Sequence, residues 1–517
     1  MDKLSEKIFL QLKMPDEEAP ISDQNRIRLA LETLGYSPVA FPLPVLQRLN
    51  PLCREAGFDV TVTLVRREYD WAIVDIESGD TTGHHYALAV DYGSTTIVMQ
   101  LVDQNSGAVV GEAKEFNGQA RYGSDILTRI TYAIQGAEQQ ADLQKATVAT
   151  LESLLGQLTQ DSGMDAFRCP VMVLSGNTAM VHFLLKLNPW TIFAAPYAPV
   201  SSDPGFLWGN ELGMDFPGLV YLVPSASNYV GGDIISGLLA LEMHKKEEIG
   251  LFFDIGTNGE LVIGNKDWMA AGAGAAGPAL EGYISQFGMR ADRGAIDSIA
   301  ISGADLSFTT IGQDKPKGIC GSGIIDLLAQ MRLAGWIDIA GQLNPEASSR
   351  IQHREGEYVA VYALPEESAS GEALYFSQTD IMQYLDTKAA AYTMVECLLE
   401  TAGVDFGDLG ALYLSGAFPY HSDLESAIQI GMFPDIPRER YQVRRNSSLD
   451  GARAILQNAQ LIPEAKSLAE NMYCVQFASY PDFLVRMQAA KFIPHTDMGR
   501  YPSVQERSNQ MVKPGIP

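Results

Sequence analysis

The sequence predicts an α/β protein in which one strand–turn–strand unit occurs twice, preceded by a small α+β domain. Strand-like apolar runs alternate with helical periodicity from Tyr86 onward, whereas residues 4–84 have a mixed character. The runs Asp91-Tyr-Gly-Ser-Thr95 and Asp254-Ile-Gly-Thr-Asn258 share one pattern, an apolar strand followed by Asp and a glycine-containing polar turn. Their separation, 254 − 91 = 163 residues, indicates a duplicated domain and not a short solenoid repeat.

The first 84 residues are expected to form the small α+β domain. Period-two alternation or continuous apolar character predicts strands, and helical spacing of apolar residues predicts helices. The predicted strands are 7–14, 58–65 and 71–76, and the predicted helices are 25–34 and 45–53. The polar residues 81–85 read as a linker. Neighbours in a strand face opposite sides, so His84 and His85 are not expected to share one metal.

The duplicated part is expected to form two lobes, over residues 85–250 and 251–490. Each lobe contains an apolar strand that ends in Asp and a strand that returns after the turn. The predicted strands are 86–90, 97–102, 171–174, 251–253, 261–263 and 411–414, and one long helix is predicted over 126–158. The residues from about His495 are polar and contain several prolines, so 491–517 is expected to be a flexible tail.

Composition excludes several classes of partner. The chain has 517 residues, with 37 basic and 63 acidic side chains and a net charge of −26. Such a surface repels nucleic-acid backbones and anionic lipid, so neither nucleic acid nor a membrane is expected as a partner. A nucleotide remains possible because loop amides act locally. The start carries charges of both signs without an apolar stretch, and a cytoplasmic location is expected.

The cysteines argue against a metal cluster. The sequence has five cysteines, an odd number, which lie far apart and form no Cys-x-x-Cys pair. Neither a structural zinc site nor an iron–sulfur cluster is therefore expected. The cysteines are Cys53, Cys169, Cys320, Cys397 and Cys474.

The repeated turn is a candidate phosphate-binding device. Glycine admits a close approach of the backbone, and amides and hydroxyls of such a turn can hold phosphate oxygens. Asp91 and Asp254 would repel phosphate unless a cation lies between them, so both are candidate water-mediated Mg²⁺ ligands and orienters of an attacking water. One such turn is common in proteins, but two copies favour a functional role. The candidate phosphate-binding residues are Gly93, Ser94, Thr95, Thr96, Gly256, Thr257 and Asn258.

Three further places have both a functional and a structural interpretation. The run 318–323, with Gly321 and Ser322, precedes a predicted helix over 324–333 and is either a phosphate or hinge loop or a helix-packing turn. Glu281 is either a contact to Mg²⁺ or nucleotide, or an acid that complements a helix dipole. Asp233 follows two glycines and is a candidate to face the phosphates.

The motifs together resemble a known family. The three strand ends look like the phosphate-1, phosphate-2 and adenosine motifs of the superfamily of acetate and sugar kinases, heat-shock chaperones and actin. Over residues 4–460 the sequence more closely resembles the reductive activators of corrinoid proteins. The matching runs include Tyr122-Gly-Ser-Asp125 with Arg129-Ile130, Gly176-Asn-Thr178, Val230-Gly-Gly-Asp233, Asp254 to Glu260, Ala275 to Gly282 and Gly318 to Gly323.

The resemblance implies a duplicated ribonuclease-H-like, actin-type ATPase fold, with residues 1–84 similar to the family's small middle domain. It also implies that ATP and Mg²⁺ bind, and that Gly416 and Ala417 lie near adenine or ribose. ATP hydrolysis would support reduction of Co(II) to Co(I) on a corrinoid protein of a methyltransferase system. Pro419, and the run 445–449 (Arg-Asn-Ser-Ser-Leu), depart from the family's glycine-containing patterns.

Family members also carry a plant-type ferredoxin domain with a [2Fe–2S] cluster. The sequence has no cysteine before Cys53, so we expect the electron to come from a separate ferredoxin or flavodoxin. A homodimer remains possible. Two alternative functions stay open, namely a small-metabolite phosphotransferase with Asp254 or Asp233 as base, and a nucleotide-gated chaperone of a corrinoid protein.

Overall fold

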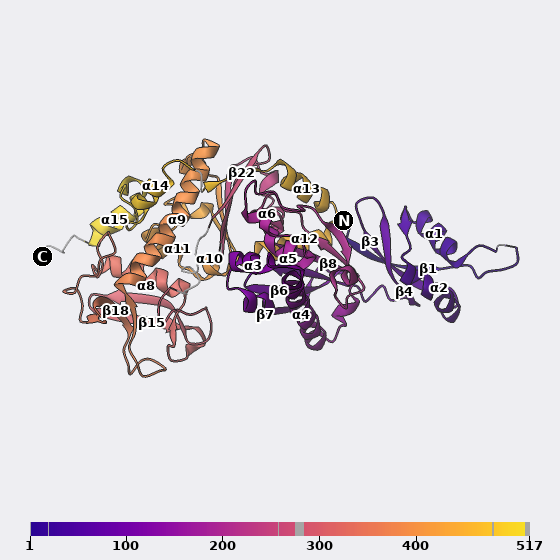
Figure 1. The fold of residues 1–517 in the computed structure, drawn as a ribbon, viewed down its shortest axis with the longest axis horizontal. Coiled ribbons are helices and arrows are strands. Elements are labelled where there is room, and N and C mark those ends of the chain that lie inside the picture. Colours follow the sequence, from indigo (N-terminus) through magenta and orange to yellow (C-terminus); the bar gives the residue numbers. More distant parts are fainter. Residues whose placement is uncertain (1, 19, 257, 275–283, 478–479, 512–517) are drawn as a thin grey trace. The chain divides into compact units, whose positions relative to one another are not determined.

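The computed structural model describes residues 2–18, 20–256, 258–274, 284–477 and 480–511. The chain divides into two compact units, Met1–Glu242 with Ser447–Met472 and Met243–Asn446 with Tyr473–Pro517. Figure 1 shows the elements of both units in sequence colours. Thr257, Glu281 and the run 275–282, which the sequence analysis singled out, lie outside the described residues.

The N-terminal part of the first unit is an α+β domain, as predicted. Its four-stranded sheet has the order β1-β3-β4-β2, and β1 and β3 are antiparallel. Ile27 and Leu31 from the first helix and Val45 and Leu49 from the second pack on the sheet in one buried cluster. The elements are β1 (Ser5–Gln11), α1 (Asp23–Thr33), β2 (Val39–Ala40), α2 (Leu43–Glu55), β3 (Asp59–Arg66) and β4 (Trp71–Ser78).

Two six-stranded sheets follow, one in each unit, and five strands of each share one topology, whereas the sixth strand lies at opposite edges. The orders are β7-β6-β5-β8-β10-β9 and β21-β20-β11-β12-β13-β22. In the first sheet β5 is antiparallel to β6 and parallel to β8. In the second sheet β11 is antiparallel to β12 and parallel to β20. The strands are β5 (Tyr86–Tyr92), β6 (Thr96–Asp103), β7 (Val109–Phe116), β8 (Val171–Gly176), β9 (Gly205–Trp208), β10 (Leu219–Leu222), β11 (Gly250–Ile255), β12 (Gly259–Gly264), β13 (Met269–Gly274), β20 (Ala411–Ser415), β21 (Tyr441–Arg444) and β22 (Tyr473–Val475). The repeated topology confirms the predicted duplication.

The prediction of one long helix over 126–158 is wrong, because the structure has two helices in this region. The first is α3 (Ile126–Ala133) and the second is α4 (Ala137–Ser162). Gly136 precedes the second helix with φ 162° and ψ 179°, an extended conformation that ends the helical hydrogen-bond ladder. Other helices of the first unit are α5 (Thr178–Leu185), α6 (Trp190–Phe193) and α7 (Gly232–Leu241).

The chain returns to the first unit near its C-terminal end, so the second lobe is not the continuous run 251–490 that we expected. Helices α12 (Ser447–Gln457) and α13 (Leu461–Asn471) belong to the first unit. A Cβ atom on Gly451 would lie 2.0 Å from the backbone oxygen of Ser236. Only glycine therefore permits α12 to pack this closely on α7.

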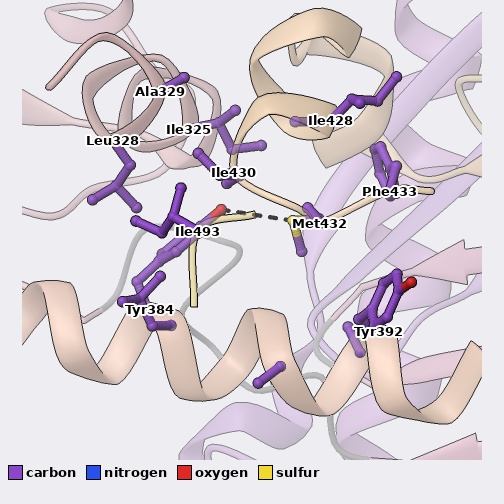
Figure 2. Packing of buried hydrophobic residues seen from close by; sticks show 14 of the residues in the cluster. Ile325, Leu328, Ala329, Tyr384, Tyr392, Ile428, Ile430, Met432, Phe433 and Ile493 are labelled. Atoms are coloured by element: carbon purple, nitrogen blue, oxygen red, sulfur yellow. Dashed lines mark hydrogen bonds between the residues drawn. The ribbon is translucent and has the colours of Figure 1, made fainter. Parts of the chain in front are cut away.

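The second unit places a large apolar core between its helices. Figure 2 shows Tyr384 and Tyr392 with Ile325, Leu328 and Met432, and the Tyr384 hydroxyl lies 3.9 Å from the Met432 sulfur. All five side chains are buried. The helices are α8 (Gly321–Leu333), α9 (Gln378–Ala402), α10 (Ala417–His421), α11 (Leu424–Gln429), α14 (Phe483–Ala490) and α15 (Pro502–Met511). Two small sheets contain β14 (Ala295–Ser302), β15 (Asp305–Thr310) and β16 (Gly318–Ile319), and β17 (Ile351–Arg354), β18 (Glu357–Ala363) and β19 (Leu374–Ser377).

The segment after residue 490 differs from the flexible tail that we expected. The Lys388 ammonium is fully buried and donates to the backbone oxygens of Ala490, Phe492 and Pro494 at 2.5, 2.6 and 2.6 Å. Burial lowers the pKa of Lys388 to about 7. Tyr501 is also fully buried, immediately before α15. The polar composition of this segment suggested a flexible tail because the residue that holds it, Lys388, lies about a hundred residues earlier in the sequence.

The two longest helices, α4 and α9, have 26 and 25 residues. Both carry several charged side chains along their length, among them Glu138 and Lys145 in α4 and Asp380 and Glu396 in α9. Across the described ranges, no helix combines the length and the apolar character that crossing a bilayer requires.

His85 predicts how the first unit responds to acid. Its ring Nε2 lies 2.9 Å from the Ser5 hydroxyl, and burial, with smaller effects of Lys7 and Lys3, lowers its pKa to about 3. The unfolded chain binds this proton below about pH 6.5 while the folded chain does not, so stability falls as the pH drops below about 6.5, by at most about 1.4 kcal/mol per pH unit. Thermal unfolding between pH 7.5 and 5.5 should therefore be less pH-dependent in His85→Gln. The exposed neighbour provides the control, and His84→Gln should follow the wild type. Equal pH dependence in all three proteins would contradict this assignment.

Candidate functional site

Asp91 is the penultimate residue of β5 and is positioned by residues from β8 and α12 of the first unit. It pairs with Ser175 across the parallel β5–β8 ladder. The Ser448 hydroxyl, from the first turn of α12, donates to Asp91 Oδ1 at 2.9 Å and lies 3.1 Å from the Ser175 hydroxyl. Ser175 donates in turn to the backbone oxygen of Gly232 in α7 at 2.9 Å. The half-buried Asp91 carboxylate is thus fixed at the ends of β5 and β8.

The second unit repeats this arrangement around Asp254. Asp254 is half-buried near the end of β11 and pairs with Ser415 across the parallel β11–β20 ladder. The following turn is closed by a hydrogen bond of 2.9 Å from the Gly256 amide to the Asn258 oxygen. Each unit therefore presents one carboxylate at the end of the first strand of its hairpin, next to the end of a parallel strand.

A tripeptide that the sequence analysis did not connect completes the repeat. Both parallel neighbours end in Leu-Ser-Gly, at 174–176 and at 414–416. A Cβ atom on Gly176 would lie 2.9 Å from the Tyr92 oxygen, and one on Gly416 would lie 2.4 Å from the Ile255 oxygen. Gly416 also has φ +114°, which disfavours other residues. Its small size serves this backbone crossing, and the side chain of Ala417 lies outside the described residues.

The turn after Asp91 is held at three successive carbonyl oxygens by Asn117 and Arg129. The Asn117 side-chain amide donates to Gly93 O at 3.0 Å, the Arg129 guanidinium to Ser94 O at 2.7 Å, and the Asn117 backbone amide to Thr95 O at 2.9 Å. In a trans peptide the C=O and the following N–H point in opposite directions. The N–H groups of Ser94, Thr95 and Thr96 therefore each point away from the donor that holds the carbonyl before them. The sequence predicted the turn, and Arg129 entered only as part of a run that resembles the family; Asn117 was not named, and neither residue was predicted to hold the turn.

Asp233 is brought to the same edge of the first sheet as Asp91. A Cβ on Gly231 would lie 2.6 Å from the Cα of Asn177, and one on Gly232 would lie 2.5 Å from the Val223 oxygen. These two glycines let α7 begin against the end of β8. Asp233, the second residue of α7, is half-buried and accepts the Ile234 amide at 2.9 Å.

The run 318–323 acts as a packing turn at its two outer glycines. A Cβ on Gly318 would lie 2.2 Å from the Phe287 oxygen, and one on Gly323 would lie 2.4 Å from the Ile296 oxygen. Ser322 is buried, with its hydroxyl 3.3 Å from the Cys320 sulfur. Gly321 and Ser322 open α8, which packs on α10, so their amides lie at a helix N-terminus of the second unit.

The two carboxylates suit Mg²⁺ better than a transition metal. Among the described residues, no group of three or more His, Cys, Asp or Glu side chains could hold a metal ion. Mg²⁺ instead uses one or two carboxylates, with water and substrate phosphates completing its shell. Asp91 and Asp254 each present one carboxylate, the number of protein ligands that such a site can use.

Models of one protein family match nearly the whole chain. Residues 1–83, 86–246 and 248–505 match family models described as the RACo linker region, the RACo middle region and the C-terminal domain of RACo, the ASKHA domain. The expectation that residues 1–84 correspond to the family's middle domain is therefore wrong, because the middle-region model covers residues 86–246 and the N-terminal α+β domain matches the linker region.

Two curated relatives and one solved structure are similar to the chain. The corrinoid activation enzyme RamQ of Eubacterium limosum is 30% identical over 80% of this chain and 71% of its own length. A [Co(II) methylated amine-specific corrinoid protein] reductase of Methanosarcina barkeri is 22% identical over 49% of this chain and 47% of its own length. The structure of a reductive activator for corrinoid, iron-sulfur protein superposes with a TM-score of 0.90 at 34% identity, over 97% of this chain and 81% of that one.

The two turn glycines differ in a way that yields a prediction. A Cβ on Gly93 would lie 2.4 Å from the Thr96 oxygen, whereas the nearest described atom to one on Gly256 is the Asn258 oxygen at 3.9 Å. Gly93→Ala should therefore destabilise the first unit by about 1–3 kcal/mol. The free energy of unfolding of Gly256→Ala, the matched control, should lie within about 0.5 kcal/mol of the wild-type value. Differential scanning calorimetry of the three proteins checks this, and equal losses in both variants would show that the hairpins are not sterically distinct.

Proposed function

This chain belongs to the RACo family of corrinoid-protein activators, and from that premise we propose that it binds and hydrolyses ATP to support reduction of Co(II) to Co(I) on a corrinoid protein. The observation that carries the proposal is the repeated strand end, in which an Asp pairs with the Ser of a Leu-Ser-Gly run on the parallel neighbour in each unit. Such strand ends beside backbone amides provide what a polyphosphate and its cation need.

The roles proposed for the residues follow from their chemistry. Asp91 and Asp254 would hold Mg²⁺ through water and orient the attacking water. Mg²⁺, when bound, offsets charge that develops on the phosphates. The first half-site consists of Asp91, the turn 93–96 and Asp233, and its backbone amides would bind phosphate oxygens. The proposed binding residues of the second unit are Gly256, Thr257, Asn258, Glu281, Gly321, Ser322, Gly416 and Ala417.

The electron is proposed to come from a separate ferredoxin or flavodoxin. Four of the five cysteines are buried, and they are too far apart in the sequence to be read as cluster ligands. Burial raises the pKa of Cys397 to about 11 and also raises that of Cys169, which disfavours the thiolates that ligate iron. The chain would then contribute nucleotide-dependent recognition of the corrinoid protein. ATP can shift such recognition only if the nucleotide-bound and nucleotide-free forms differ in affinity for that partner.

The assignment of Asp254 is tested by one substitution. Asp254→Asn keeps the shape but removes the charge, so ATP hydrolysis should fall by about 10²-fold or more. The control is Asp267→Asn, an exposed Asp in the loop between β12 and β13, which should retain the wild-type rate. Steady-state phosphate release, with calorimetry to confirm folding, makes the comparison. Wild-type turnover in Asp254→Asn would refute the role.

The activator function is tested optically. The protein is mixed with a corrinoid protein held as Co(II) and a reduced low-potential ferredoxin or flavodoxin, and ATP is added. We expect ATP-dependent conversion of the Co(II) absorption to that of Co(I) with the wild type and about 10²-fold slower conversion with Asp254→Asn.

Other outcomes of this experiment point to different functions. ATP hydrolysis without Co(I), stimulated by a small alcohol or carboxylate, would indicate a phosphotransferase. ATP binding with slow hydrolysis and an unchanged cobalt state would indicate a nucleotide-gated chaperone of the corrinoid protein. Either result would contradict the activator proposal.

A further inference from the structure

Arg129 is a buried cation whose charge the fold does not use for an ion pair. Its side chain is 1% exposed, and among the described residues it pairs with no carboxylate. Its partners are the backbone oxygens of Ser94 and Gly123 at 2.7 and 2.9 Å, with Gln119 Oε1 at 3.4 Å and the Met180 sulfur at 3.8 Å. Burial lowers the pKa of Arg129, and the charge of Asp125 opposes this effect without forming an ion pair; a guanidinium keeps its proton in proteins.

An unpaired buried charge is costly to maintain, and its partners here do not require it. Carbonyl oxygens accept equally from neutral amides, as Gly93 O does from the Asn117 side chain at 3.0 Å. A glutamine at position 129 could satisfy a carbonyl at a lower desolvation cost. A negative charge that arrives with a ligand would offset this cost, because opposite charges in a poorly solvated place attract strongly.

The position of the guanidinium shows where that ligand would lie. It binds the carbonyl side of the Ser94–Thr95 peptide, so the Thr95 N–H points to the opposite side. Asn117 holds the carbonyl groups of the two flanking peptides, Gly93–Ser94 and Thr95–Thr96, by donating to Gly93 O and Thr95 O. The Ser94–Thr95 peptide thus has its carbonyl on the guanidinium side and its N–H on the side away from the guanidinium.

We propose that Arg129 is a positioning residue for the phosphates of the nucleotide: it locks the orientation of the Ser94–Thr95 peptide and lends the turn a positive charge from behind. This inference rests on the proposed function, since it names the residue that prepares the first half-site for a polyanion. It predicts that Arg129 matters in proportion to the number of phosphates on the ligand. A residue that only supported the fold would affect adenosine and ATP alike.

The experiment compares three variants of the full-length protein. Arg129→Gln removes the charge and keeps a neutral donor, and Arg129→Lys keeps the charge without the planar fork. The control, Arg121→Gln, makes the same change of net charge at an exposed arginine that lies over the Tyr122 ring. Isothermal titration with adenosine, ADP, ATP and inorganic tripolyphosphate measures affinity, and calorimetry confirms folding.

For Arg129→Gln we expect ATP and tripolyphosphate to bind about 10- to 100-fold more weakly, ADP less so, and adenosine unchanged. Arg129→Lys should fall between this variant and the wild type, and Arg121→Gln should match the wild type. Should Arg129→Gln fail to fold, Arg129→Lys decides the matter, and wild-type ATP affinity in it would overturn the proposal.

The remaining outcomes separate this inference from the proposed function. Equal ATP affinity in the wild type and Arg129→Gln would overturn the inference while ATP binding stands. Binding of tripolyphosphate but not ATP, with the expected loss in Arg129→Gln, would support the inference and overturn the ATP proposal. Binding of neither ligand to the wild type would overturn both.

Discussion

The backbone passes so close to Gly176 and to Gly416 that neither position has room for a side chain, and the placement of Asp91 and Asp254 depends on this constraint. In each unit the peptide oxygen that follows the candidate Asp lies where a side chain would otherwise begin, 2.9 Å and 2.4 Å from the position of a Cβ. Because no Cβ is present, the parallel strands can pair up to their last residues, and Ser175 and Ser415 come opposite Asp91 and Asp254. The carboxylates therefore emerge at strand ends that the rest of each sheet holds rigid.

The first half-site additionally depends on chain that is remote in sequence. Ser448 donates to Asp91 although 357 residues separate them. It can do so because Gly451 lets α12 approach α7 so closely, which fixes the first turn of that helix. A local change in the α7–α12 contact would therefore reach Asp91 through one hydroxyl group.

The sequence sufficed for features that are local or repeated. The two Asp-containing hairpins, their spacing and the strands beside them follow from patterns a few residues long, which a single chain displays openly. The anchoring of residues 490–501 by Lys388 and the contact between Ser448 and Asp91 depend instead on tertiary packing, whereas the helix break at Gly136 is local and was hidden by the helical spacing on either side of it. Asn117 and Arg129 were equally hidden, because a polar side chain in a helical or turn segment gives no sign that it will point inward. The Leu-Ser-Gly repeat was visible in the sequence, and a search for short identical runs at strand ends would have found it.

The acidic character of the chain sharpens the question of how it could hold a polyanion. A net charge of −26 acts over the surface, where salt screens it beyond about 8 Å at physiological ionic strength. Arg129 and the oriented peptides act over a few ångströms and from a buried position, where screening is weak. At the turn, the attraction of Arg129 and the peptide dipoles for a phosphate can therefore exceed the repulsion from the acidic surface, and no basic surface patch is needed. The same reasoning explains why such a site would select a compact polyphosphate and reject a nucleic-acid backbone, whose charges extend over the acidic surface around it.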